Sequence, residues 1–359
     1  MHAPQLSPFE KHSFFAVVGQ EMRIIMSSIP ELPPPLVVQN APGYNSWPFV
    51  QGLGNNKLVC AYSRGEKHSI AERCRGVYAR TSLDNGQSWT DETMVVNTPE
   101  AGESAIGKGL DADGAMLLWV RCVGDAWRHD LYRSTDGVSF SKIASLQPEP
   151  MPMQITDVFS VPGVGLMSFW FAGRYREEPE NSWGTLTSAD NGLTWKQKVV
   201  EAGLQKSDWP TEQSGVYLGD GRVLAITRVE KTSDPAKQGC QFQLESSDGG
   251  KTWKKMRTNI GDVRESTPSL LWDAESGLLS NYYFQRSAGV LKRRVAPLSA
   301  VWGNPLAWPA PEIVAVGSAD DYHAGNVNAF ARGGTHFCTF YSGNETQTEV
   351  VIAPVPAPF

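Results

Sequence analysis

The sequence has no excess of basic residues, few cysteines and no long apolar run. Lys and Arg number 32 against 38 Asp and Glu, a net charge of −6, and the basic residues are scattered. Because phosphate backbones are held by clustered Lys and Arg, this balance argues against a nucleic-acid partner. The five cysteines contain no CxxC spacing, which excludes a disulfide framework or a zinc site as the organising device. No stretch approaches the roughly 20 apolar residues of a membrane helix.

The N-terminal segment also lacks the features of a secretory signal. Its apolar run, Phe14 to Gly19, is short, is flanked by Glu10 and Glu21, and is followed by no clean small-residue cleavage site. We interpret residues 1–35, which end in the segment ELPPP, as an arm or leader, and we expect residues 36–359 to form the folded domain. Secreted, virion-associated and cytoplasmic locations all remain open.

Glycine, proline and aromatic residues are plentiful, and short apolar runs alternate with turn residues, which is typical of all-β proteins. A motif of the form SxDxGxTW recurs. In such a turn the Asp caps backbone amides, the Gly takes a positive φ, and the aromatic ring packs against its sheet. Copies begin at Ser82, Ser188 and Ser246, with one shorter copy at Ser134, and their aromatic residues lie 51 to 58 residues apart.

A second repeat runs in phase with this motif. It consists of an apolar strand, a Gly-containing turn and a second apolar strand, ending at Arg64, Arg121, Arg174, Arg228, Arg286 and Ser342. Six units of about four strands predict a six-bladed β-propeller with four-stranded antiparallel blades. We expect Leu36 to Gln39 to pair with Val350 to Val355 and so close the ring.

Propellers with these motifs resemble the sialidase superfamily, and the resemblance covers residues 36–355. It places the function at the central mouth, where Glu212 begins an inner strand and Arg228 ends the next strand 16 residues later. The resemblance implies that Glu212 acts as a base and that Arg228 and Arg286 grip a substrate carboxylate. Two guanidinium groups give bidentate recognition that Lys would not match. The alternative is that Arg228 is only the repeat's terminal Arg, with Glu212 as its ion-pair partner.

Tyr322, in the segment DDYHAG, aligns with the nucleophilic tyrosine of sialidases. The anomeric carbon of a sialic acid bears a carboxylate, so an anionic nucleophile would approach against like charge, whereas a phenol avoids this repulsion. The phenol needs an adjacent base, the role expected of Glu212. Tyr322 could instead be an aromatic residue that fills the mouth of the ring.

The sequence departs from the family in the first and sixth repeats. Trp47 stands where exo-acting sialidases have an arginine, and Ser342 stands where they have the glutamate that braces it. Loss of both the arginine and its glutamate indicates that the site has changed as a unit, because either charge buried without its partner would be costly. No Asp occurs between Trp47 and Asp84 to act as the acid, which leaves Glu66, His68 and Glu72 as candidates. A core position for Trp47 and a surface position for His68 remain alternatives.

The first repeat is similar to that of phage endosialidases, which act inside polysialic acid and keep a glutamate and two arginines. Their aromatic pair and histidine correspond to Tyr44, Trp47 and His68. We therefore expect a glycosidase that cleaves α-ketosidic bonds of sialic acid or a related nonulosonic acid. Tyr44 and Trp47 would contact the sugar, His68 or Glu66 would protonate the leaving oxygen, and no metal or organic cofactor would be needed. The alternatives are a propeller glycosidase for another acidic glycan and a non-catalytic carbohydrate-binding or assembly propeller.

Overall fold

The computed structural model describes residues 32–359 except 55, 174–180, 231–238, 264 and 321. The predicted N-terminal arm therefore lies almost wholly outside the described residues, as does Arg174. Residues from Pro34 to Phe359 form one compact unit. Within the described residues no helix combines the length and apolarity that crossing a bilayer requires.

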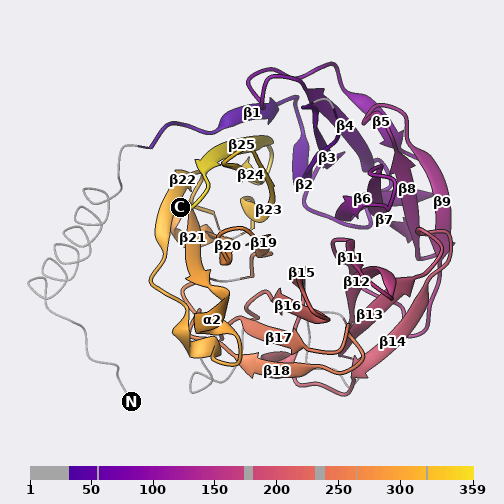
Figure 1. Cartoon of the computed structure of the whole chain (residues 1–359). Coiled ribbons are helices and arrows are strands. Elements are labelled where there is room, and N and C mark those ends of the chain that lie inside the picture. Colours follow the sequence, from indigo (N-terminus) through magenta and orange to yellow (C-terminus); the bar gives the residue numbers. More distant parts are fainter. Residues whose placement is uncertain (1–31, 55, 174–180, 231–238, 264, 321) are drawn as a thin grey trace, which may run out of the picture. The chain divides into compact units, whose positions relative to one another are not determined.

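The compact unit is an all-β, propeller-like ring of antiparallel sheets (Figure 1). The first sheet to follow the ring closure contains β6 (Ala101–Leu110), β7 (Met116–Gly124), β8 (Arg128–Ser134) and β9 (Ser141–Leu146). The next contains β10 (Gln154–Ile155), β11 (Phe159–Val161), β12 (Gly165–Ala172), β13 (Ser182–Ser188) and β14 (Lys196–Glu201). Two four-stranded sheets follow, formed by β15 (Ser214–Gly219), β16 (Arg222–Ile226), β17 (Phe242–Ser246) and β18 (Lys254–Arg257), and by β19 (Ser269–Asp273), β20 (Leu278–Gln285), β21 (Val290–Pro297) and β22 (Glu312–Val316).

The remaining sheet has eight strands and joins the two ends of the ring. Its strands are β1 (Leu36–Gln39), β2 (Tyr44–Gly52), β3 (Leu58–Gly65), β4 (Gly76–Ser82), β5 (Thr93–Val96), β23 (Gly325–Arg332), β24 (Thr335–Gly343) and β25 (Thr348–Pro356). The short helices are η1 (Lys206–Asp208), η2 (Arg286–Ala288), α2 (Leu298–Val301) and η3 (Pro305–Ala307). The predicted closure is confirmed, because β1 pairs antiparallel with β25, with Leu36 opposite Ile352.

The described residues thus form five hydrogen-bonded sheets, not six separate four-stranded ones. The difference arises where the chain ends meet: a single parallel pair, Tyr44 with Thr348, joins β2 to β25 and merges two units into one sheet. The all-β fold and the four-stranded antiparallel unit are confirmed.

The core lies between neighbouring sheets. Trp119 of β7 packs in one cluster with Ile155 of β10 and Trp170 of β12, and each is fully buried. Because a sheet is covered on both faces by its neighbours, its inner strands are apolar on both sides, as in the almost wholly buried MLLWVRC run of β7.

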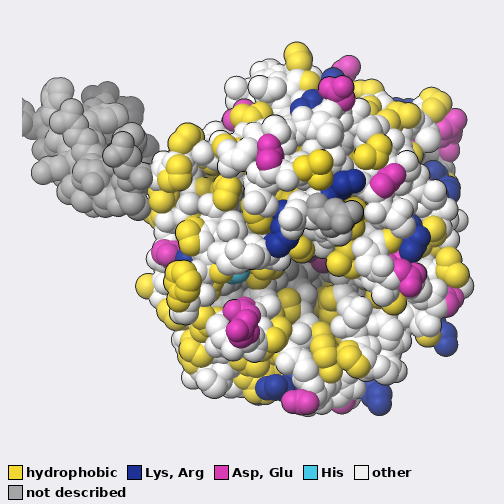
Figure 2. Space-filling model, turned by 45° about the horizontal axis from the view of Figure 1, so that its top comes forward, with side chains coloured by type: hydrophobic (Ala, Val, Ile, Leu, Met, Phe, Trp, Pro, Cys, Tyr) yellow, Lys and Arg dark blue, Asp and Glu magenta, His cyan; other side chains and the backbone are white. Residues whose placement is uncertain are grey.

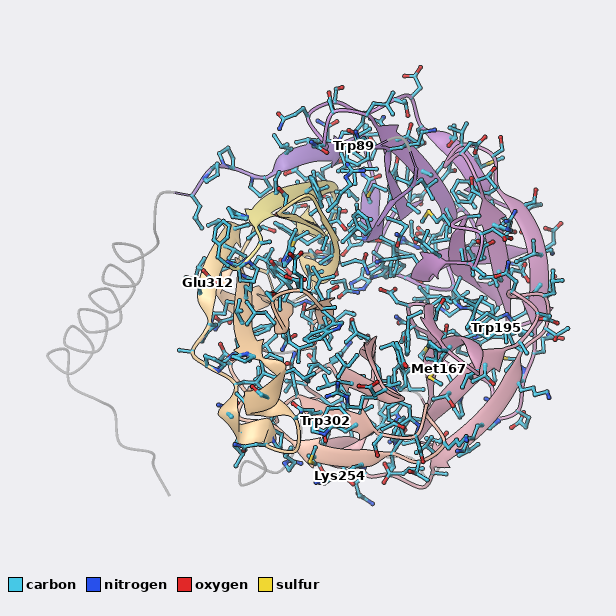
Figure 3. The ribbon with its side chains drawn as sticks, in the orientation of Figure 1. Trp89, Met167, Trp195, Lys254, Trp302 and Glu312 are labelled. Atoms are coloured by element: carbon cyan, nitrogen blue, oxygen red, sulfur yellow. The ribbon has the colours of Figure 1, made fainter. Side chains whose placement is uncertain are left out.

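The SxDxGxTW turns have the predicted geometry. In the first copy Ser82 Oγ donates to Asp84 Oδ1 (2.8 Å), the Ser88 amide donates to the same oxygen (2.9 Å), and Gly86 has a φ of 83°. Hydrogen bonds from Ser88 lower the pKa of Asp84 to about 2. The indole nitrogens of Trp89, Trp195 and Trp253 each donate to the carbonyl of the motif glycine, at 3.2, 3.0 and 3.0 Å. Figure 3 shows Trp89 and Trp195 toward the outer side of the ring, which agrees with a structural role.

Candidate active site

A cavity of about 280 Å³ lies at the centre of the ring, and Figure 2 shows the hollow near the centre of one face. Inner strands β2, β6, β15, β19 and β23 surround this axis in Figure 1. Six of the eight residues predicted for the site line the cavity: Trp47, His68, Glu212, Arg228, Arg286 and Tyr322. The predicted convergence of residues from the first, fourth, fifth and sixth repeats is therefore found, although their chemical roles stay predictions.

Three cavity-lining residues have a left-handed backbone. Trp47, Glu212 and Asn326 have φ values of 51°, 46° and 51°, and each lies within or just before the innermost strand of its repeat. Such conformations are unfavourable for bulky side chains and cost about 1–3 kcal/mol each. Strain at equivalent places in three repeats supports a functional role for this cavity, because the fold alone does not require a Trp or a Glu there.

Glu212 and Arg228 form the ionic side of the cavity. Both are largely buried, and Glu212 Oε1 lies 2.8 Å from Arg228 Nη1, while Thr267 Oγ1 donates to Glu212 Oε2. Arg228 Nε also pairs with Glu230 (3.0 Å), and its Nη2 approaches Glu265 (3.7 Å). Burial raises the pKa of Glu230. Arg228 is thus surrounded by carboxylates and holds Glu212 in a fixed orientation toward the cavity.

Arg286 has a different environment. Its Nε donates to the Ala324 carbonyl (2.8 Å), and its Nη2 donates to Asn326 Oδ1 (3.0 Å) and to the Tyr341 hydroxyl (3.4 Å). These partners are all neutral, and within the described part of the chain no carboxylate forms an ion pair with Arg286. A nearly buried guanidinium that lines a cavity without a counter-charge favours an anionic ligand.

The first repeat supplies the aromatic side. His68 lies 5.6 Å from Trp47 and stacks on Tyr44 at 5.5 Å, measured between ring centroids. His68 keeps an exposed side toward the cavity, but desolvation by the surrounding residues, aided by the positive charge of Arg286, lowers its pKa to about 4. Contrary to the prediction, Tyr44 does not line the cavity. It is fully buried, its ring stacks on His68, and its hydroxyl contacts His323 Nδ1 (3.0 Å). Tyr44 therefore packs against His68 and is shielded from the cavity.

Tyr322 is half-exposed at the cavity edge. Its carbonyl accepts hydrogen bonds from the hydroxyls of Tyr341 (2.8 Å) and Tyr44 (3.4 Å), which fix its backbone above the cavity. Glu66 is exposed, as His68 is, but unlike His68 it is not among the residues that line the cavity. The prediction that Glu66 serves as an alternative acid is corrected accordingly, since its loop presents His68 to the cavity instead.

The sequence reasoning missed several residues of the site. Arg121, nearly buried, lines the cavity from the second repeat and donates to the Met153 carbonyl (2.9 Å). Thr267 orients Glu212, and Asn326 orients Arg286. Arg121 ends the second strand of its repeat, and this position could have indicated a site residue. Nothing in the sequence distinguished it from Arg64, which has the same position but pairs with Glu92.

One group of side chains outside the cavity comes close enough to share a metal ion. Ligand atoms of Glu66, Glu72 and Cys74 lie within 4.8 Å of one another. Glu72 already accepts hydrogen bonds from the Glu66 amide (3.1 Å) and from Arg75 (3.1 Å). These contacts explain the cluster as part of a loop, and we assign no metal to it.

Comparisons with known proteins agree with the fold. A family model described as a BNR repeat-like domain matches residues 57–287, and no curated protein matches the chain. Among solved structures, a protein of unknown function from Dyadobacter fermentans is similar, with 18% identity and a TM-score of 0.67, over 90% of this chain and 100% of that one.

Two enzymes are also similar in fold. The phage phi92 endosialidase has 12% identity and a TM-score of 0.64, over 90% of this chain and 69% of that one. The Trypanosoma rangeli sialidase, solved in complex with sialic acid, has 11% identity and a TM-score of 0.63, over 91% of this chain and 57% of that one. Identities this low show a shared fold only.

Proposed function

Because the chain belongs to the family of BNR repeat-like domains, and its fold is shared with sialidases, we propose that it is a glycoside hydrolase. Its proposed substrate is the α-ketosidic bond of sialic acid or a related nonulosonic acid. One observation carries this proposal: Arg286 lines the central cavity with neutral partners only, and a fixed carboxylate, Glu212, lines the same cavity. This arrangement suits a sugar that carries its own carboxylate.

In the proposed reaction Arg286, with Arg228 beside it, binds the substrate carboxylate, and Trp47 walls the sugar ring. The bond between the anomeric carbon and the leaving oxygen breaks, and protonated His68 gives its proton to that oxygen. Glu212 takes the proton of the attacking group. That group is either water, in one step, or the Tyr322 hydroxyl, in which case water releases the sugar from a covalent intermediate in a second step.

We also propose that the ring has six structural units. The eight-stranded sheet divides at its one parallel pair into β2–β5 and a unit of β23–β25 with β1, each antiparallel within itself. With the other four sheets this gives one unit for each repeat in the sequence. Such a division supports the expectation of six blades, with the first and sixth next to each other where the ring closes, as the contact between Tyr44 and His323 (3.0 Å) indicates.

The proposal is tested by hydrolysis of a fluorogenic α-sialoside and of polysialic acid by the full chain and by Glu212→Gln. Loss of a positioned base costs about 10²- to 10⁴-fold in kcat, so the variant should lose most turnover while its folding is unchanged. Glu312→Gln is the matched control, since Glu312 also pairs with an arginine (Arg293, 2.7 Å) but lies at the outer edge of the ring (Figure 3). It should keep full activity.

Three results would change or contradict the proposal. Turnover of the polymer without turnover of the sialoside would assign internal cleavage. No turnover of either, together with glycan binding that is unchanged in Glu212→Gln, would contradict the proposal and favour a carbohydrate-binding propeller. Turnover of another acidic glycan alone would support a glycosidase and contradict sialic acid as its substrate.

A further inference from the structure

Arg75 lies directly behind the aromatic side of the cavity. Its side chain is fully buried, and its guanidinium donates to the Ser69 carbonyl (2.8 Å), to Ser46 Oγ (3.2 Å) and to the Lys67 carbonyl. Its one ion-pair partner among the described residues is Glu72, at 3.1 Å. Arg75 therefore ties together the start of β2, which carries Trp47, and the loop 65–75, which carries His68.

The same guanidinium packs against the aromatic rings. Its central carbon lies 4.7 Å from the centroid of the Trp47 ring and 5.8 Å from that of Tyr44. Tyr44, Trp47, His68 and Arg75 thus form one packed group, called here the aromatic wall. Trp47 lines the cavity and Arg75 does not, and the buried guanidinium lies over the indole ring, so we infer that it covers the face turned away from the cavity.

We propose that Arg75 is a positioning residue that holds His68 and Trp47 as one rigid wall and makes this wall electropositive toward an anionic sugar. A cation bound to one face of an indole draws the π-density toward itself, so the opposite face repels an anion less. Trp47 replaces a cavity-lining cation, and Arg75 supplies that positive charge from behind the ring. The effect on an anionic sugar rests on the proposed function, whereas the positioning of His68 does not.

The charge of Arg75 distinguishes this role from a merely structural one. A buried guanidinium is costly, and a neutral side chain could fill the same space. The positive charge acts on His68 together with the other groups that face it: Arg286 and His323 from the fifth and sixth repeats, and Arg228 from the fourth. Charge at Arg75 therefore has a readout at His68 that packing alone would not give.

The test is an NMR titration of His68 in the full chain, with His68→Gln to assign its signal among the six histidines. Arg75→Met should raise the pKa of His68 from about 4 toward its ordinary value of 6.5, because one repelling charge is removed. Glu72→Gln should lower it, because the charge of Arg75 loses its counter-ion. Arg64→Met, which removes an arginine of the same repeat that pairs with Glu92, should leave it unchanged.

Binding of a 2,3-dehydro sialic acid analogue gives the second readout. Arg75→Met should weaken its affinity by up to about tenfold, because the wall loses a positive charge that acts on the bound anion, and Arg75→Lys should restore part of the loss. If Arg75→Met does not fold, the opposite shift in Glu72→Gln still decides the proposal.

A pKa of His68 that moves in neither variant, or that moves as much in Arg64→Met, would overturn the proposal. A shifted His68 in a protein that neither binds nor hydrolyses sialic acid would support the positioning role, and the proposed function would then fail separately.

Discussion

The outer turns and the central cavity are built from the same repeats but use them in opposite ways. At the rim, the turns at Asp84, Asp190 and Asp248 repeat the same hydrogen bonds to within a few tenths of an ångström. At the cavity, equivalent strand starts carry Trp47, Glu212 and Asn326, which share no chemistry. The comparison indicates that the repeated residues stabilise the ring and that the residues which break the repeat determine what it binds.

The rim should respond to mutation in stability alone. Trp195 is half-buried, packs edge-to-face on Trp119 at 5.1 Å, and bonds to its own turn. Trp195→Ala should lower the free energy of unfolding by about 3–4 kcal/mol, measured by denaturant titration, and leave kcat/KM unchanged. Leu193→Ala, in the same turn but 58% exposed, should change stability by less than about 0.5 kcal/mol. A change of substrate preference in Trp195→Ala would break the comparison.

Two histidines extend the comparison between scaffold and cavity, because desolvation lowers the pKa of both His129 and His68 to about 4. His129 lies fully buried in the scaffold and bonds through Nε2 to the Pro152 carbonyl (2.9 Å). In the unfolded chain His129 binds a proton below about pH 6.5, whereas in the folded chain it stays neutral down to about pH 4. The contribution of neutral His129 to the free energy of unfolding is therefore fully present above pH 6.5, and about 3 kcal/mol of stability is lost as the pH falls toward 4. Unfolding free energies measured between pH 7 and 4 should show a shallower pH dependence in His129→Gln. Identical slopes in the two proteins would contradict this assignment.

At the cavity, removal of Arg286 should lower catalysis beyond its effect on stability, which denaturant titration measures separately. A charge-assisted hydrogen bond contributes about 2 kcal/mol, so Arg286→Ala should lower kcat/KM for a sialoside about 30-fold. Arg286→Lys should recover only part of this loss, because an ammonium cannot form the two parallel bonds. Arg222→Ala is the control: Arg222 packs over Trp302, which does not line the cavity, and its loss should leave kcat/KM unchanged. Equal losses in Arg286→Ala and Arg222→Ala would refute the role.

His68 should show its lowered pKa in the pH profile. A general acid must be protonated to act, and with a pKa of about 4 only about one molecule in a thousand is protonated at pH 7. We expect kcat/KM to fall as the pH rises above about 4. His68→Gln should lose about tenfold at pH 5 and almost nothing at pH 7. A loss that is the same at both pH values would show that His68 acts by packing only.

The rim and the ring closure could be predicted from the sequence because their geometry follows from local, repeated chemistry. Ser, Asp and Gly at fixed spacing specify a turn, and the apolar runs at Leu36 and Val350 specify a strand pair. The convergence of Glu212, Arg228 and Arg286 was predictable for the same reason, since each occupies a fixed place in its repeat.

The first-repeat side of the cavity was not predictable in the same way. The residues of the loop 65–75 belong to neither repeated motif, so nothing indicated that His68 would line the cavity and that Glu66 would not. Arg75 is held mainly by backbone carbonyls, which carry no signal in a sequence. The burial of Tyr44 depends on His323, a contact between distant parts of the chain.

A structure of the chain bound to a 2,3-dehydro sialic acid analogue tests the central claim most directly. The account predicts that the sugar occupies the central cavity with its carboxylate within hydrogen-bond distance of Arg286 and with Glu212 near the anomeric carbon. A sugar bound elsewhere, or a carboxylate that points away from Arg286, would contradict it.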